Sequence, residues 1–133
     1  IDYGPVERQI IEVHEKFRLE SVGYDAWNAS QTVQRLLAAG VKMEQFIQGP
    51  KSYHPAMQAL EVAYLSGRLA HGNDPVLNWN ASNIVARYDA NLNTAPDKKR
   101  ASEKIDDMCA LLMAVGRSIA EREPEPLNQL FFV

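Results

Sequence analysis

The sequence has little cysteine and no long hydrophobic run. Cys109 is its only cysteine, which excludes an internal disulfide and a cysteine-based zinc site. This residue lies in an apolar run with helical spacing, so we expect a buried, unreactive thiol. No segment approaches the roughly 20 apolar residues that a membrane span requires, and the N-terminus lacks a signal-peptide pattern. These absences predict a cytosolic protein.

Basic residues are also fewer than acidic residues. Lys and Arg total 14 against 17 Asp and Glu, which gives a net charge of −3 and a pI of about 5.6. Proteins that hold DNA through a broad basic surface usually carry a net positive charge. The sequence also contains no P-loop, so we expect neither ATP binding nor ATP hydrolysis. It contains no nucleophile elbow or histidine pair either, which leaves little support for an unrelated small-molecule enzyme. Any nucleic-acid function must therefore come from a local site.

The residues that are present suit one domain or a large piece of one. The chain has 133 residues, of which 46% are hydrophobic and 23% charged, as in ordinary globular proteins. It begins with Ile1 in place of an initiator methionine and enters a helical pattern almost at once. From this abrupt start we expect a fragment or a processed chain.

The apolar spacing predicts helices and strands in alternation, which is typical of an α/β fold. The predicted elements are a helix over 6–17, a strand ending near Asp25, a helix capped by Asn28 or Ser30 and stopped by Gly40, a strand over 41–47, a helix from about His54 to Ser66, a short extended piece over 69–71, a helical turn through Trp79, a strand over 83–89, a loop over 91–99, and a helix capped by Ser102 that runs to about Glu121.

Two acidic positions have placements that suit chemistry. Asp25 follows a predicted strand, and open α/β sheets bind ligands beyond the carboxyl ends of their strands. Asp106 lies in the first turn of the last predicted helix, where the backbone dipole favours a carboxylate. Each position also has an ordinary structural interpretation. Asp25 suits a turn, and Asp106 and Asp107 suit the first turn of any helix.

Two sequence blocks resemble a known family. The run Tyr24-Asp-Ala-Trp-Asn-Ala29 resembles the Y-D-x-W-N-A segment of terminase large subunits of tailed phages. Further along, His71-Gly-Asn-Asp-Pro-Val-Leu-Asn-Trp79, followed by Ser82-Asn83, is similar to the same family's H-G-x-N-P-V-L-x-W-x-x-S-N. Each pattern alone is short and weakly specific.

A third block completes the resemblance. Pro96-Asp-Lys98, Ser102 and Lys104-Ile-Asp106, followed by Ala110-Leu-Leu-Met-Ala-Val-Gly116, resemble the family's P-x-K, S-x-R-I-D and A-L-I-M-A-x-G. The three blocks occur in the family's order and at similar spacings, which makes them specific together. The chain therefore resembles the C-terminal part of a terminase large subunit, within its nuclease domain.

The resemblance implies a fold and an activity. The expected fold is α/β, a ribonuclease-H-like mixed sheet with flanking helices that lacks its first strands. Residues 1–122 would form the C-terminal portion of the nuclease domain, and residues 123–133 a C-terminal tail. The implied activity is metal-dependent endonucleolytic cutting of concatemeric double-stranded DNA during genome packaging, in the cytoplasm of a bacterial host cell.

The resemblance also assigns roles to the acids. Asp25 matches the acid of the Y-D-x-W block, and Asp106 that of the I-D block. Both would be catalytic carboxylates that bind Mg²⁺ or Mn²⁺ in a two-metal site, because hard cations prefer oxygen ligands. Asp107 stands where the family often has Gly or Ala. It is either a further metal ligand or a surface acid, since neighbouring helix residues point about 100° apart.

One family acid has no counterpart in this alignment. The family has another metal-binding aspartate upstream of the segment aligned here, and Asp2 matches no family acid. We therefore expect an incomplete site and little or no DNA cutting by the 133 residues alone. Metal-dependent plasmid cleavage that Asp25→Ala abolishes would contradict this expectation.

The remaining candidates concern DNA and partners. Lys98, Lys99 and Lys104 are candidate DNA-binding residues near Asp106, although lysines in a loop are often only solvated. His71 is expected to be structural or near the substrate and not catalytic. Trp27 and Trp79 are expected to pack against the protein and not to stack on bases.

Partners implied by the resemblance are double-stranded DNA and, in the full-length protein, the terminase small subunit and the portal. Self-association into a homo-oligomer is also possible, because missing strands would leave apolar surface exposed. No membrane partner is expected. The alternative to an endonuclease is a non-catalytic, prophage-derived interaction or oligomerisation module. The acidic balance and the unmatched carboxylate favour that alternative.

Overall fold

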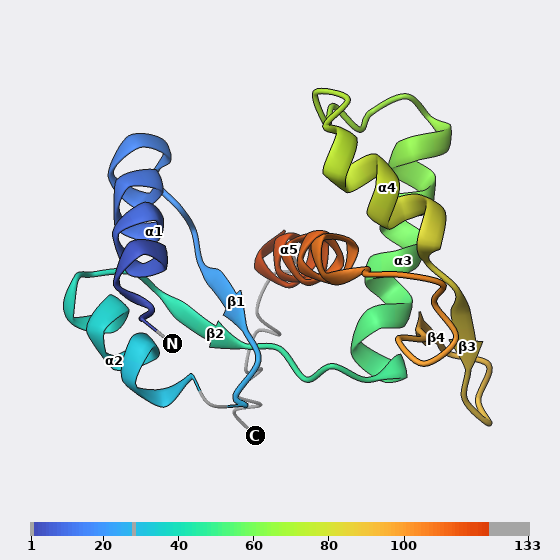
Figure 1. The fold of residues 1–133 in the computed structure, drawn as a ribbon, viewed down its shortest axis with the longest axis horizontal. Helices are drawn as coiled ribbons and strands as arrows, with labels where there is room; N and C mark the ends of the chain where they lie inside the picture. The colour runs from blue at the N-terminus through green and yellow to red at the C-terminus, as the bar shows by residue number, and fades with distance from the viewer. Residues whose placement is uncertain (1, 28, 123–133) are drawn as a thin grey trace, which may run out of the picture.

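The computed structural model describes residues 2–27 and 29–122 (Figure 1). Its helices and strands are, in chain order, α1 (Gly4–Phe17), β1 (Val22–Tyr24), α2 (Ser30–Ala38), β2 (Met43–Gln45), α3 (Pro50–Leu65), α4 (Pro75–Asn83), β3 (Ala86–Tyr88), β4 (Thr94–Pro96) and α5 (Asp106–Arg122). Within this part of the chain, no helix is long and apolar enough to cross a membrane.

Helix α5 lies at the centre of the molecule. Helices α1 and α2 and the β1–β2 pair stand on one side of it, and α3, α4 and the β3–β4 pair stand on the other (Figure 1). The predicted alternation of helices and strands and the α/β class are both present. The strands form two small sheets, one parallel and one antiparallel.

The parallel pair is a strand–helix–strand unit. β1 pairs with β2 through the register Val22↔Met43 to Tyr24↔Gln45, and α2 makes the crossover that parallel strands require. Gly40 ends this crossover helix with a left-handed backbone, φ 86°, as predicted. Ser30 is the first residue of α2 and not its cap, while Asn28 lies outside the described residues.

Helix α1 is present as predicted, but its apolar stripe is not buried along its length. Val6 is 53% exposed and Phe17 is 64% exposed. The helix is instead joined to α2 by a polar contact, because Arg35 Nη1 lies 3.3 Å from the buried carboxylate of Glu7. Spacing alone predicted this helix correctly.

Two predicted helices differ in extent from the observed ones, for identifiable reasons. Helix α3 begins at Pro50 and not near His54, because Pro50 suits the first helical turn after the extended Gly49. The expected turn before Trp79 is a full helix, α4, whose N-terminal amides of Val76 and Leu77 are capped by Asp74 Oδ1 at 2.9 and 2.8 Å.

The segment predicted as a loop contains β4. Thr94–Pro96 pairs antiparallel with β3, in the register Ala86↔Pro96 to Tyr88↔Thr94. Ser102 does not cap α5, which begins four residues later at Asp106. Its hydroxyl instead donates to Asn83 Oδ1 at 3.1 Å. Both errors concern contacts between segments that local spacing does not report.

The core lies where α5 meets α3 and the ends of β2 and β4. Its buried members are Phe46, Tyr53, Ala56, Ala95 and Leu112. The Phe46 and Tyr53 rings pack with centroids 5.2 Å apart and a tilt of 56°. Helix α5 thus supplies the surface on which the rest of this core assembles.

Gly116 lets α5 approach this core closely. A Cβ built on Gly116 would lie 2.8 Å from Phe46 Cε2 and 3.5 Å from Ala56 Cβ, and Phe46 is only 7% exposed. We therefore expect Gly116→Ala to destabilise the fold. Overpacking lowers the free energy of unfolding by about 1–3 kcal/mol, which exceeds the increase of about 1 kcal/mol that alanine's better helix propensity gives. Urea unfolding measures the difference.

A double variant separates crowding from other effects. In Phe46→Leu the smaller side chain leaves room at residue 116, so adding Gly116→Ala should cost much less than it does in the original background. The exposed Ala114 gives the helix-propensity control, because Ala114→Gly should cost about 1 kcal/mol. Increased stability in Gly116→Ala would contradict the close approach.

Candidate metal centre and nucleic-acid interface

Asp25 lies directly after β1, at the carboxyl end of the parallel pair. Its Oδ1 accepts the backbone N–H of Trp27 at 3.2 Å, which is the predicted turn interaction. Its Oδ2 accepts the Gln48 side-chain amide at 2.9 Å. Gln48 reaches Asp25 because it follows β2, and the carboxyl ends of parallel strands meet at one edge.

Asp106 lies in the first turn of α5, as expected from the sequence, and is the first residue of that helix. Its Oδ1 lies 3.3 Å from Lys98 Nζ, and both side chains are largely exposed. Asp107 is held through its backbone N–H, which donates to Asn80 Oδ1 at 3.1 Å. Its side chain is exposed beside that of Asp106.

A hollow of about 460 Å³ connects the partners of the two aspartates. Its lining residues are Gln48, Tyr53, Arg87, Pro96, Asp97, Lys98, Lys99 and Cys109. Gln48 is the hydrogen-bond partner of Asp25, and Lys98 is that of Asp106. Asp25 and Asp106 do not themselves line this hollow, but each is hydrogen-bonded to a residue that does.

The pKa values of two lining side chains agree with this placement. Burial raises the pKa of the Tyr53 hydroxyl above its ordinary value, and the Cys109 thiol and the charge of Asp25 raise it further. Burial also raises the pKa of the Cys109 thiol, with a smaller contribution from Asp106 and opposition from Lys98. Cys109 is a buried, protonated thiol, as expected from the sequence.

The donor set suits a hard divalent cation. Carboxylate oxygens of Asp25 and Asp106 are the ligands that Mg²⁺ and Mn²⁺ prefer, and the Gln48 amide can add a neutral oxygen. Within residues 2–27 and 29–122, no group of three or more His, Cys, Asp or Glu side chains is placed to hold a metal ion. Among these residues, no third His, Cys, Asp or Glu side chain therefore completes a metal-binding group with the two candidate carboxylates.

Cations line the hollow from two sides. Arg87 comes from β3, and Lys98 and Lys99 come from the turn after β4. Asp97 holds that turn by accepting the backbone N–H groups of Lys99 and Arg100 at 3.0 and 3.2 Å. Lys104 is exposed in the segment before α5 and is not among the residues that line the hollow.

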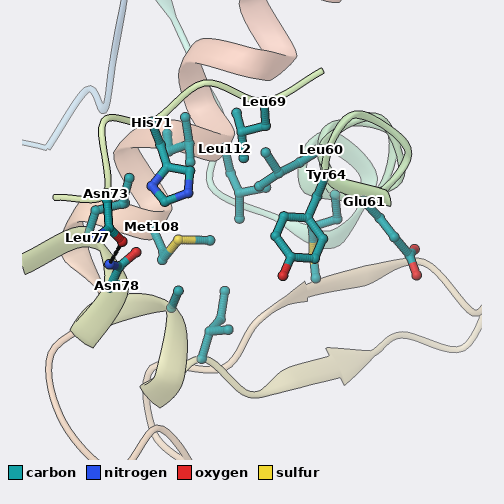
Figure 2. A pocket seen from close by; sticks show the side chains of 14 residues that line it. Leu60, Glu61, Tyr64, Leu69, His71, Asn73, Leu77, Asn78, Met108 and Leu112 are labelled. Atoms are coloured by element: carbon teal, nitrogen blue, oxygen red, sulfur yellow. Dashed lines mark hydrogen bonds between the residues drawn. The ribbon is translucent and has the colours of Figure 1, made fainter. Parts of the chain in front are cut away.

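A second hollow, of about 580 Å³, lies where α5 faces α3 and α4, and its lining is mostly apolar (Figure 2). Figure 2 shows the His71 ring beside it with Met108 and Leu77, and the hydrogen bond of 2.8 Å from Asn78 Nδ2 to Asn73 Oδ1. Its lining contains no aspartate, and none of its residues lines the first hollow. His71 therefore lines a different hollow from the one that Gln48 and Lys98 line.

The expectation that both tryptophans pack is wrong for Trp27. Trp27 is 87% exposed and Trp79 is 45% exposed. Trp27 follows Asp25 by two residues, in a turn that projects from the end of β1. The sequence could not show this exposure, because an apolar ring predicts burial wherever a neighbouring surface is available.

Three residues of the site were missed by sequence reasoning. Gln48 had one usable signal, since it follows a predicted strand as Asp25 does. Arg87 belongs to a strand whose side chains are all exposed, and nothing local shows which way it faces. Tyr53 reaches the hollow only because α3 begins earlier than predicted and packs on α5.

Comparisons with known proteins place the chain in a family. The family profile described as "Terminase large subunit, endonuclease domain" matches residues 1–123. The large terminase subunit of Enterobacteria phage HK97 is 37% identical over 123 residues, covering 91% of this chain and 24% of that protein. Protein YmfN of Escherichia coli (strain K12) is 33% identical over 84 residues, covering 62% of this chain and 18% of YmfN.

A solved structure is similar as well. The crystal structure of the HK97 bacteriophage large terminase matches with a TM-score of 0.78 and 38% identity, covering 88% of this chain and 25% of that one. This likeness confirms the expected fold class. The chain spans about a quarter of the length of the HK97 protein. On the match of profile, sequence and fold, the chain belongs to the endonuclease-domain family of terminase large subunits.

Proposed function

We propose that this chain forms part of a metal-dependent DNA endonuclease centre that cuts concatemeric double-stranded DNA during phage genome packaging. One observation carries the proposal. Asp25 and Asp106 are hydrogen-bonded to Gln48 and Lys98, and these two partners line a single hollow together with the positively charged Arg87 and Lys99. Paired carboxylates beside a cationic surface suit the binding of a divalent metal and a DNA phosphate.

We assign metal binding to the aspartates and DNA binding to the lysines. Asp25 and Asp106 hold Mg²⁺ or Mn²⁺, with Asp107 as an alternative ligand on the same helix turn. Bound metal supplies activation of water for attack on phosphorus and charge stabilisation at the departing 3′ oxygen. Lys98, Lys99 and Lys104 attract the DNA backbone, which adds affinity that falls with salt.

The wider assignments rest on the family. Residues 1–122 are proposed to form a portion of the nuclease domain, and residues 123–133 its C-terminal tail. In the full-length protein the proposed partners are double-stranded DNA, the terminase small subunit and the portal, in the cytoplasm of the bacterial host. A homo-oligomer is a further proposed state.

Paramagnetic Mn²⁺ tests the metal centre directly. In a ¹H–¹⁵N spectrum of the chain, substoichiometric Mn²⁺ should broaden the amide signals around Asp25, Gln48 and Asp106 first, and EDTA should restore them. The double variant Asp25→Asn, Asp106→Asn should lose this selectivity. Broadening that is centred elsewhere, or that persists in the double variant, would refute the metal centre.

Plasmid nicking in Mg²⁺ or Mn²⁺, compared with EDTA, tests the cutting itself. Cleavage that requires metal and disappears in Asp25→Ala would support the endonuclease function and contradict the low activity expected from the resemblance. If Mn²⁺ does not bind at the two aspartates and the chain self-associates, the alternative of a non-catalytic interaction module is supported. Exposed apolar side chains on α3, such as Val62, Tyr64 and Leu65, favour that alternative.

A further inference from the structure

The hollow beside Asp25 and Asp106 contains a buried hydroxyl without a partner. Tyr53 is only 3% exposed and lines the hollow. Its hydroxyl lies near the Cys109 thiol, a weak acceptor, and makes no hydrogen bond of ordinary geometry in the part of the chain that the structure describes. Most buried hydroxyls in folded proteins are hydrogen-bonded, because an unpaired polar group loses its water without compensation. A Tyr53 hydroxyl without a partner therefore points to a missing ligand.

The charges around this hydroxyl indicate the kind of ligand. Arg87, Lys98 and Lys99 line the same hollow, and the only acid in its lining, Asp97, accepts backbone N–H groups. Among the described residues, neither Arg87 nor Lys99 forms an ion pair. An excess of positive charge around a hydroxyl donor suits an anion with oxygen acceptors.

We propose that Tyr53 and Arg87 form a phosphate subsite, in which the Tyr53 hydroxyl and the Arg87 guanidinium donate to non-bridging oxygens of a DNA backbone phosphate. The assignment rests on the proposed endonuclease function, because it takes the ligand to be nucleic acid. It extends that function to two residues outside the metal-binding pair and outside the candidate lysines.

The position of the subsite relates it to the metal-binding pair. Gln48 and Lys98 line the hollow, and in this structure they hydrogen-bond to Asp25 and Asp106. Both are long, flexible side chains. A backbone phosphate that displaces them from the hollow would reach the Tyr53 hydroxyl, and this displacement does not require a bound metal.

Binding without metal tests the subsite. In EDTA, the chain is titrated with inorganic phosphate and, separately, with a short DNA duplex, and the amide signals of Tyr53, Arg87 and Lys99 are followed by NMR. Tyr53→Phe should weaken both interactions about three- to tenfold, the value of one hydrogen bond. Arg87→Gln should weaken duplex binding at least as much and lower its salt dependence.

Matched controls separate a binding role from a structural one. Tyr53→Phe keeps the ring that packs on Phe46, so its unfolding midpoint should stay unchanged or rise while anion binding falls. Tyr88→Phe and Arg68→Gln change exposed residues outside the hollow and should bind as the unchanged chain does. Unaltered binding in Tyr53→Phe, or weakened binding that parallels lost stability, would overturn the proposal.

Two further outcomes are informative. If the variants weaken inorganic phosphate binding and leave duplex binding intact, the assignment to the DNA backbone is overturned. Mn²⁺ broadening around Asp25 and Asp106 should persist in Tyr53→Phe, because the metal-binding carboxylates are unchanged. Loss of metal binding at the two aspartates defeats the endonuclease proposal, whereas normal metal binding with unaltered anion binding in Tyr53→Phe defeats only the subsite.

Discussion

Asp106→Asn should weaken Mn²⁺ binding by at least about tenfold, because even the loss of a group that merely orients a metal ligand costs about 10–100-fold. Asparagine has nearly the same shape as aspartate and keeps one oxygen, so the change removes charge with little change in packing. Free Mn²⁺ is measured by electron paramagnetic resonance during titration. Any metal-dependent DNA cutting by the chain should fall by a larger factor.

Asp107→Asn is the matched control for this prediction. Both residues lie in the first turn of α5 and both face solvent, so each substitution removes a similar favourable interaction with the helix dipole. Only Asp106 pairs with Lys98, a residue that lines the hollow. We therefore expect Asp107→Asn to change the Mn²⁺ affinity less than twofold.

A larger effect of Asp107→Asn than of Asp106→Asn on Mn²⁺ affinity would assign the metal to Asp107. If Asp107→Asn weakens Mn²⁺ binding and Asp106→Asn does not, Asp107 is the ligand and Asp106 is a surface acid. Asp25→Asn should behave as Asp106→Asn does, since the two carboxylates are proposed to share the metal. Unequal effects of these two variants would show that they do not form one site.

Much of the fold was predictable because its signals are local. Periodic apolar residues indicated α1, α2 and α5, and the glycine that ends α2 has the left-handed backbone expected at that position. Asp25 and Asp106 were placed at a strand end and a helix start by the same local reasoning. Their metal-binding role came from the family resemblance, because position alone also fits an ordinary turn or helix cap.

The wrong predictions concern segments whose structure depends on contacts with residues far away in the sequence. β4 is a short segment containing Pro96, and it is a strand only because β3 pairs with it. Asp97 and Ser102 then hold the segment before α5 through a backbone turn and a bond to Asn83. Neither interaction has a signature in the spacing of apolar residues.

The hollow was beyond sequence reasoning for the same reason. Its lining comes from the end of β2, the start of α3, β3, the turn after β4 and one face of α5. Only tertiary packing brings Tyr53, Arg87 and Lys98 together, since they are separated along the chain by other helices and strands. The sequence therefore offered the two candidate acids and could not show the hollow that their hydrogen-bond partners line.

Leu112→Ala should cause the largest loss of stability, about 2–5 kcal/mol, because it leaves a cavity at a buried position. Leu112 is 1% exposed and lies in the core cluster with Phe46, Tyr53, Ala56 and Ala95. Domains of this kind unfold with a total of about 5–15 kcal/mol, so one such cavity removes a large fraction. Urea unfolding followed by circular dichroism gives the difference.

Leu37→Ala is the control for replacing a helical leucine with alanine. Leu37 also lies in a helix but is 52% exposed, so the same substitution should cost less than about 1 kcal/mol. Leu112→Met keeps the volume of the side chain and should cost less than about 1.5 kcal/mol, which shows whether the site tolerates an unbranched residue. Equal losses in Leu112→Ala and Leu37→Ala would mean that α5 does not organise the core.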